Sequence, residues 1–178
     1  MSRISRLQQK FEQLYIDAFL VTDQKNIYYL TGFNLLQGDG CLLVTPQNAI
    51  IITDERYQLA LEEFESDEVV ATISRDYYGS VNKICEGLNL TVLGYEDTIS
   101  YHLFDVFDEL MTSDIVPFHH LIEKMRLVKD STEINKLRAA AELQSAGYDY
   151  FLSIVHPGVT ERELAIKLDY WMKMQGAS

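Results

Sequence analysis

The stretch GCLLVTPQNAIIIT, residues 40–53, contains two apolar runs rich in β-branched residues, with only residues 46–48 between them. Pro46 and Asn48 in so short a gap are typical of a tight turn. The sequence therefore predicts an antiparallel hairpin, with one strand over 40–45 and the next over 49–53.

Further strands and helices alternate on both sides of this hairpin. Apolar runs predict strands over 16–22, 68–73, 91–96 and 114–118. Helices are expected at the N-terminus, where Ile4, Leu7, Phe11 and Leu14 share a helical spacing, and over 26–30, 55–64, 80–88 and 101–111. We expect Asn26 to cap the second helix and Gly32 to end it. Pro117 suits an edge strand.

This alternation predicts an α/β fold for residues 1–123, with a mixed β-sheet flanked by helices. Residues 124–178 form a linker and two long helices, 130–155 and 160–176. Each helix begins with a capping box, Asp130 with Glu133 and Thr160 with Glu163. The first is apolar on two sides and should lie between two layers. We expect a second copy of the chain to cover these apolar faces, giving a homodimer.

Composition excludes several classes of partner. The net charge is −12, which disfavours binding to nucleic acid or to an anionic membrane. No apolar run approaches the roughly 20 residues of a membrane span, and the start lacks the apolar core of a signal peptide. Cys41 and Cys85 stand apart from each other, so we expect two reduced, buried thiols in a cytoplasmic protein.

Motifs for self-contained catalysis are missing from the sequence. It has no Gly-x-Gly-x-x-Gly, no phosphate-binding Gly-Lys-Ser, no Gly-x-Ser-x-Gly and no His-Glu-x-x-His. His119 and His120 are adjacent; on a strand they would point to opposite faces, with no further ligand at metal-binding spacing. The aromatic stretches 27–33 and 75–79 are typical of a ligand site or of a core. The sequence therefore predicts no catalytic residue and no metal ligand here.

Three stretches in order carry a resemblance to a known family. They are DAFLVTDQKNIYYLTGF (17–33), AIIITDERY (49–57), and MRLVKDSTEINKLRAAAE (125–142) continued by PGVTERELAIKLDYWMKMQGAS (157–178). Together they resemble the proline-specific metallopeptidases of the pita-bread fold: Xaa-Pro aminopeptidase, Xaa-Pro dipeptidase (prolidase) and their relative creatinase. Thr53, Asp54, Arg56 and Tyr57 are similar to a Thr-Asp-x-Arg-Tyr motif of the bacterial aminopeptidases.

The resemblance implies a creatinase-type N-terminal α/β domain followed by a catalytic domain that binds two divalent metal ions, manganese, cobalt or zinc. The family's metal ligands match no position of this sequence. We therefore expect residues 124–178 to be the first helices of a truncated pita-bread domain. The parent protein is expected to hydrolyse the bond between an N-terminal residue and proline, and this chain alone to be inactive.

The resemblance also implies which residues matter. The loop from Phe33 to Gly40 is expected to reach the active site of a partner subunit, with Phe33, Asn34, Gln37 and Asp39 at the substrate or the interface. Motif residues expected to have a structural or interface role are Tyr29, Thr31, Gly32, Asp54, Arg56 and Tyr57. Two alternatives stay open: a non-catalytic dimerisation or regulatory module, and a creatinase-like amidinohydrolase parent.

Overall fold

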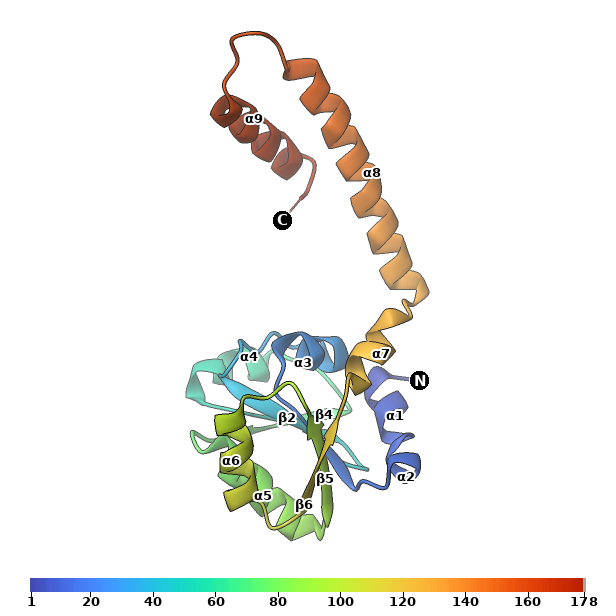
Figure 1. Cartoon of the computed structure of the whole chain (residues 1–178), viewed down its shortest axis with the longest axis vertical. Helices are drawn as coiled ribbons and strands as arrows, with labels where there is room; N and C mark the ends of the chain where they lie inside the picture. The colour runs from blue at the N-terminus through green and yellow to red at the C-terminus, as the bar shows by residue number, and fades with distance from the viewer. Residues whose placement is uncertain (178) are drawn as a thin grey trace. The chain divides into compact units, whose positions relative to one another are not determined.

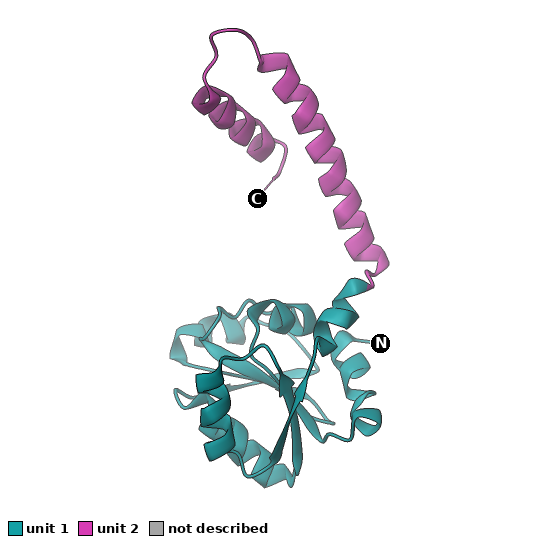
Figure 2. Cartoon of the chain, viewed as in Figure 1, with its two compact units in different colours: residues 1–127 teal, residues 128–178 magenta. Residues whose placement is uncertain are grey.

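The computed structural model describes residues 1–177. The chain divides into two compact units, the first ending at Leu127 and the second beginning at Val128 (Figure 2). The predicted boundary after residue 123 falls inside helix α7 (Leu121–Leu127), whose Ile122 and Met125 are buried in the core of the first unit.

The first unit is one mixed sheet with helices on both faces (Figure 1). Its strands are β1 (Ala18–Val21), β2 (Gly40–Val44), β3 (Ala49–Thr53), β4 (Val69–Ile73), β5 (Val92–Glu96) and β6 (Asp114–Phe118). Its other helices are α1 (Arg3–Gln8), α2 (Phe11–Leu14), α3 (Gln24–Thr31), η1 (Glu55–Tyr57), α4 (Gln58–Glu62), α5 (Tyr77–Leu88) and α6 (Tyr101–Leu110). The α/β fold with a mixed sheet is confirmed.

The strand order is β4-β3-β2-β1-β5-β6. The predicted hairpin is present, since β2 and β3 pair antiparallel from Gly40 opposite Thr53 to Val44 opposite Ala49. Strand β2 also runs antiparallel to β1, while β1, β5 and β6 are mutually parallel and β3 is parallel to β4. Among these six strands, β2 alone is therefore antiparallel to the others. Pro117 lies on the edge strand β6, as predicted.

Alternation along the strands divides the core into two layers. One face of the sheet packs Phe19, Leu42 and Ile51 against helices α1, α2, α3 and α7. The other packs Leu20, Leu43 and Ile52 against α5 and α6, where Cys85 and Phe107 are buried. Strands β1, β2 and β3 are buried on both faces, which explains their continuous apolar runs. Cys41 and Cys85 are free thiols, and burial raises the pKa of Cys85 to about 11.

Two details near the N-terminus differ from the prediction. The expected first helix is divided into α1 and α2, with Tyr15 after them in a left-handed conformation. Asn26 does not cap α3: the Asp23 side chain accepts the hydrogen bond from the Asn26 backbone amide, and Asn26 itself is buried inside the helix. The prediction placed the cap too late because Asp and Asn have similar capping preferences. Gly32 ends the helix at φ +79°, as predicted.

The second unit is a helical hairpin of α8 (Ser131–Ile154) and α9 (Glu161–Met174). Both predicted capping boxes are present. Helix α9 packs on α8 where Gly147 allows close approach, and Trp171 stacks on Tyr150 at 5.1 Å between ring centroids. Several apolar side chains of this unit stay exposed, among them Leu137, Leu152 and Ile166. Within residues 1–177, no helix is long and apolar enough to cross a membrane.

Candidate functional site

Five strands end along the same side of the sheet, and β2 begins there. We call this side the carboxyl edge: it carries the residues that follow β1, β3, β4, β5 and β6 and the loop 33–40 that precedes β2. Because the backbone leaves a sheet at such an edge, side chains from segments distant in sequence meet there.

The end of α3 fixes where the loop 33–40 begins. The Thr31 hydroxyl donates to the backbone carbonyl of Ile27 at 2.8 Å and accepts from the Phe33 amide at 3.0 Å. Gly32 then takes the left-handed conformation that turns the chain. The Phe33 side chain is buried and packs edge-on against Phe64. Phe33 is therefore anchored in the core of this unit, and its predicted role at the substrate or the interface stays a prediction.

Gln37 fastens the middle of the loop to the β1–α3 turn. Its Nε2 donates to the backbone carbonyl of Thr22 at 3.1 Å, and its Oε1 accepts from the Gln24 amide at 2.9 Å. Gln24 opens α3, so this amide has no partner within the helix. Next to it, the exposed Asn34 side chain accepts from Gln24 Nε2 at 3.2 Å.

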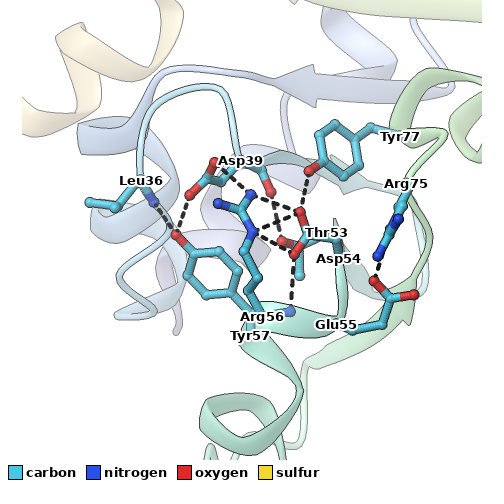
Figure 3. Close-up of polar contacts among 9 residues, drawn as sticks. All are labelled: Leu36, Asp39, Thr53, Asp54, Glu55, Arg56, Tyr57, Arg75 and Tyr77. Atoms are coloured by element: carbon cyan, nitrogen blue, oxygen red, sulfur yellow. Dashed lines mark hydrogen bonds and ion pairs between the residues drawn. The ribbon is translucent and has the colours of Figure 1, made fainter.

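Asp39 fastens the end of the loop to the residues after β3 (Figure 3). Its carboxylate accepts from Arg56 Nη2 at 2.8 Å and from the Tyr57 hydroxyl at 2.7 Å. Its backbone carbonyl accepts from the Thr53 hydroxyl at 2.6 Å. The Tyr57 hydroxyl in turn accepts from the Leu36 amide at 3.2 Å. The loop is thus held at several points, and the Leu36 side chain remains 54% exposed.

Asp54 is the centre of the same cluster. It accepts from Arg56 Nη2 at 2.7 Å and from the Tyr77 hydroxyl at 2.8 Å (Figure 3). The bonds from Arg56 and Tyr77 hold the pKa of Asp54 well below its ordinary value, and those from Tyr57 and Arg56 lower the pKa of Asp39. Both carboxylates are therefore ionised near neutral pH. Since each is already hydrogen-bonded, the cluster positions the loop and is not arranged for proton transfer.

Beside this cluster the surface forms a charged hollow. It has a volume of about 410 Å³ and is lined by Asp54, Glu55, Arg56 and Arg75. Arg75 Nε donates to Glu55 Oε2 at 3.1 Å.

The predicted residues Asp39, Asp54, Arg56 and Tyr57 come together in this cluster, and Tyr77 joins them. Tyr77 lies in the aromatic stretch 75–79, for which the sequence left two interpretations open, a ligand site or a part of the core.

A second polar cluster lies at the carboxyl edge, and the sequence analysis did not predict it. Asn26 is fully buried, and its Nδ2 donates to Glu96 at 2.7 Å and to Glu123 at 2.6 Å. Its Oδ1 accepts from Arg126 at 2.9 Å. Glu96 also accepts from the backbone amides of Thr22 and Asp23. Glu96 is the last residue of β5, and Asp54 directly follows β3. An acidic residue at the end of a strand was therefore the sequence signal that could have identified this cluster.

Tyr29 lies apart from the loop. Its hydroxyl donates to the backbone carbonyl of Met125 at 3.1 Å, and Arg3 stacks over its ring at 4.4 Å. Tyr29 therefore joins α3 to α1 and α7, which is a structural role.

The two adjacent histidines do not point to opposite faces, as a strand would require. Strand β6 ends at Phe118, His120 has φ +53°, and the rings of His119 and His120 lie 3.9 Å apart. His119 contacts Asp97 at 2.7 Å. Among residues 1–177, no group of three or more His, Cys, Asp or Glu side chains could hold a metal ion. The described residues do not fit a two-metal centre.

Comparison with known proteins agrees with this fold. Residues 3–128 match the family model described as the creatinase/prolidase N-terminal domain. The chain belongs to this family. An Xaa-Pro dipeptidase from Pyrococcus furiosus is 27% identical, over 98% of this chain and 49% of its own length. The uncharacterized peptidase YqhT of Bacillus subtilis is 29% identical, over 98% of this chain and 50% of its own.

Solved structures of the family align with almost the whole chain. The Xaa-Pro dipeptidase from Bacillus anthracis matches with a TM-score of 0.83 and 32% identity, over 98% of this chain and 49% of its own. The X-Pro aminopeptidase from Thermotoga maritima matches with a TM-score of 0.82 and 26% identity, over the full chain and 51% of its own. The chain spans about half the length of each of these four relatives.

Proposed function

We propose that this chain is the N-terminal part of a metal-dependent peptidase that cleaves between an N-terminal residue and proline, as an Xaa-Pro aminopeptidase or dipeptidase. The family match over residues 3–128 carries the proposal. It is supported by relatives named Xaa-Pro dipeptidase and X-Pro aminopeptidase that align over 98% of this chain or more. We place the two divalent ions, manganese, cobalt or zinc, on residues outside this chain. The buried thiols of Cys41 and Cys85 favour the cytoplasm.

The role that we assign to this chain is dimerisation and substrate gating. The loop 33–40 is held in place by Gln37 and Asp39, yet it leaves the apolar Leu36 side chain exposed. A fixed loop with an exposed apolar side chain suits one wall of a pocket for a proline ring. In a homodimer, this wall would belong to the active site of the other subunit.

The first experiment measures hydrolysis of Xaa-Pro dipeptides and longer Xaa-Pro peptides with manganese or cobalt. We expect no hydrolysis by the 178-residue chain alone, and hydrolysis by the longer protein that contains this chain as its N-terminal part. Turnover by the chain alone that survives repurification and is removed by a chelator would contradict the placement of the metal site. No hydrolysis by the peptidase that carries it would favour a non-catalytic module.

The second experiment tests gating in the active peptidase. Gln37→Ala and Asp39→Ala should each lower kcat/KM for Xaa-Pro substrates by roughly tenfold, or about 1.4 kcal/mol. Gln47→Ala is the matched control, because Gln47 lies in the turn at the opposite end of β2 and β3. If the loop variants match the control within about twofold, or ~0.4 kcal/mol, the loop is only a connection.

A further inference from the structure

A hollow lies between the N-terminal helices and α7, which Figure 1 shows beside α1. Its volume is about 490 Å³, within the range of small-molecule sites in proteins, roughly 300–1,000 Å³. Two stretches of chain line it: Arg6, Gln9, Lys10 and Gln13 on one side, and Leu121, Lys124 and Met125 on the other. We call it the basic hollow, because three of these residues are cations and none is a carboxylate.

Helical spacing explains why these side chains converge. Residues 121, 124 and 125 are three or four positions apart and therefore share one face of α7. Arg6 and Lys10 are also four positions apart. Gln9 and Lys10 keep right-handed helical angles between α1 and α2, so the spacing holds across the break between these two helices.

The floor of the basic hollow is apolar and belongs to the core. Met125 is buried, and Leu121 packs against the same cluster of buried residues. The Tyr29 hydroxyl donates to the Met125 carbonyl at 3.1 Å, which joins α7 to α3. Because the floor is part of a packed core, the hollow keeps its shape without a ligand.

The three cations of the basic hollow lack a carboxylate partner in the part of the chain that the structure describes. Among residues 1–177, neither Arg6 nor Lys10 forms an ion pair, although both are half-buried. Lys124 Nζ donates only to the backbone carbonyl of His119, at 3.4 Å. Like charges four positions apart repel one another, so Arg6 and Lys10 oppose folding unless an anion binds between them.

Neighbouring groups do not remove this excess of positive charge. The one carboxylate of α7, Glu123, accepts instead from Asn26 at 2.6 Å. The last turn of a helix favours a cation, which accounts for Arg6 on α1 and Lys124 on α7 taken singly. It does not account for their meeting with Lys10 around one concave space.

We propose that the basic hollow binds the phosphate group of a small molecule. Arg6 offers a planar pair of donors that matches two phosphate oxygens, and Lys10 and Lys124 add two further positive charges. The carboxamides of Gln9 and Gln13 can donate to the same group. A guanidinium, two ammonium groups and two carboxamides suit an anion with several acceptor oxygens.

The size of the hollow and the charge of the chain select a small ligand. A net charge of −12 disfavours nucleic acid and anionic membranes, whose contacts would extend beyond the hollow. Leu121 and Met125 offer an apolar surface to the organic part of a phosphate ester. None of the lining residues belongs to the loop 33–40, and this binding does not depend on peptidase activity.

Titration calorimetry of the 178-residue chain tests the site with two probes, inorganic phosphate and phenyl phosphate. We expect saturable binding, and Arg6→Gln, Lys10→Gln and Lys124→Gln should each raise the Kd at least ~10-fold. Lys83→Gln is the matched control, because it removes the same charge from an exposed position of α5, on the other face of the sheet. It should change the Kd by less than about twofold. Circular dichroism checks that every variant is folded.

The two probes also distinguish the sources of the phosphate group. Phenyl phosphate that binds at least ~5-fold more tightly than inorganic phosphate would identify an ester whose organic part contacts the apolar floor. Equal Kd values for the two probes would identify the free ion as the ligand.

Four outcomes would overturn the proposal. Neither probe binds at concentrations of about 10 mM, which corresponds to less than ~3 kcal/mol of binding free energy. The three glutamine variants bind as the Lys83→Gln control does. Binding is lost in Arg75→Gln and kept in the three variants, which would place the anion in the charged hollow beside Asp54. A tetraglutamate peptide binds while neither phosphate probe does, which would assign the hollow to an acidic protein segment.

Discussion

Arg56 Nη2 lies 2.8 Å from Asp39 Oδ1 and 2.7 Å from Asp54 Oδ2, so one guanidinium joins the end of the loop 33–40 to the residue that follows β3. The Arg56 side chain is 63% exposed, and an isolated ion pair there would add little stability. Its effect is geometric, because a planar guanidinium can bond two carboxylates at fixed angles.

Arg56→Lys should therefore free the loop without unfolding the domain, since an ammonium group cannot reproduce both contacts. Hydrogen exchange should become roughly tenfold faster at the amides of residues 36–39. Arg75→Lys changes only the exposed contact with Glu55 and serves as the control. Equal exchange in the two variants would mean that Gln37 and Tyr57 hold the loop without Arg56.

The two glycines of the loop should respond very differently to alanine. Gly40 has φ +150°, and a Cβ there would overlap the backbone carbonyl of Ile52 on β3. Gly38 has φ +87° with open space around it. Gly40→Ala should lower the free energy of unfolding by more than ~3 kcal/mol and Gly38→Ala by about 1 kcal/mol. Urea denaturation measures both, and similar losses would contradict the close approach at Gly40.

Asn26→Ala should be strongly destabilising because it removes three hydrogen bonds of a buried cluster. Glu96 and Glu123 each lose a donor, and Arg126 loses an acceptor. The expected loss is about 2–4 kcal/mol in the free energy of unfolding. The exposed Asn34 is the matched control, and Asn34→Ala should change stability by less than ~0.5 kcal/mol. A loss at Asn26 no larger than at Asn34 would refute a supporting role for the cluster.

Stability should also depend on pH through Glu96. Burial raises its pKa above the ordinary value of 4.5, although bonds from Asn26, Thr22 and Asp23 oppose the shift. The folded protein then binds the Glu96 proton more tightly than the unfolded chain does. This carboxyl's contribution to stability therefore declines as pH rises from about 4.5 to the folded pKa, and is constant above it. Denaturation at several pH values should show this decline in the wild type and not in Glu96→Gln.

Much of the fold could be predicted from local patterns. The hairpin 40–53 and the capping boxes at Asp130 and Thr160 depend on residues adjacent in sequence, and all three are present. The Asn26 cluster depends instead on the parallel pairing of β1 with β5, which brings residues 70 or more positions apart into contact. A buried Asn has no sequence pattern of its own, so it was mistaken for a helix cap.

The candidate site was predicted only in part, because some of its contacts also join residues that are distant in sequence. Asp54, Arg56 and Tyr57 are close in sequence and were recognised together as a motif. Their contacts with Asp39 and Tyr77 span 17 and 23 residues and depend on the order of β2, β3 and α5 along the carboxyl edge. The contact of the Phe33 ring with Phe64 likewise joins residues distant in sequence, and no local pattern indicates it.

The α8–α9 hairpin can be tested at Gly147 with the chain's single tryptophan as the reporter. A Cβ at this position would lie 2.7 Å from Met172 Sδ, the end of a flexible side chain that can move aside. Gly147→Ala should therefore be tolerated, and it gains helix propensity of about 1 kcal/mol.

Gly147→Val adds two methyl groups against Leu168 and Trp171 and should separate the helices. Trp171 would then lose its stacking on Tyr150, and its fluorescence should shift to longer wavelength. Ser145→Val, on the exposed side of α8, carries the same β-branched penalty and should leave the emission unchanged. If Gly147→Val also leaves it unchanged, close packing at Gly147 does not hold α9 in place.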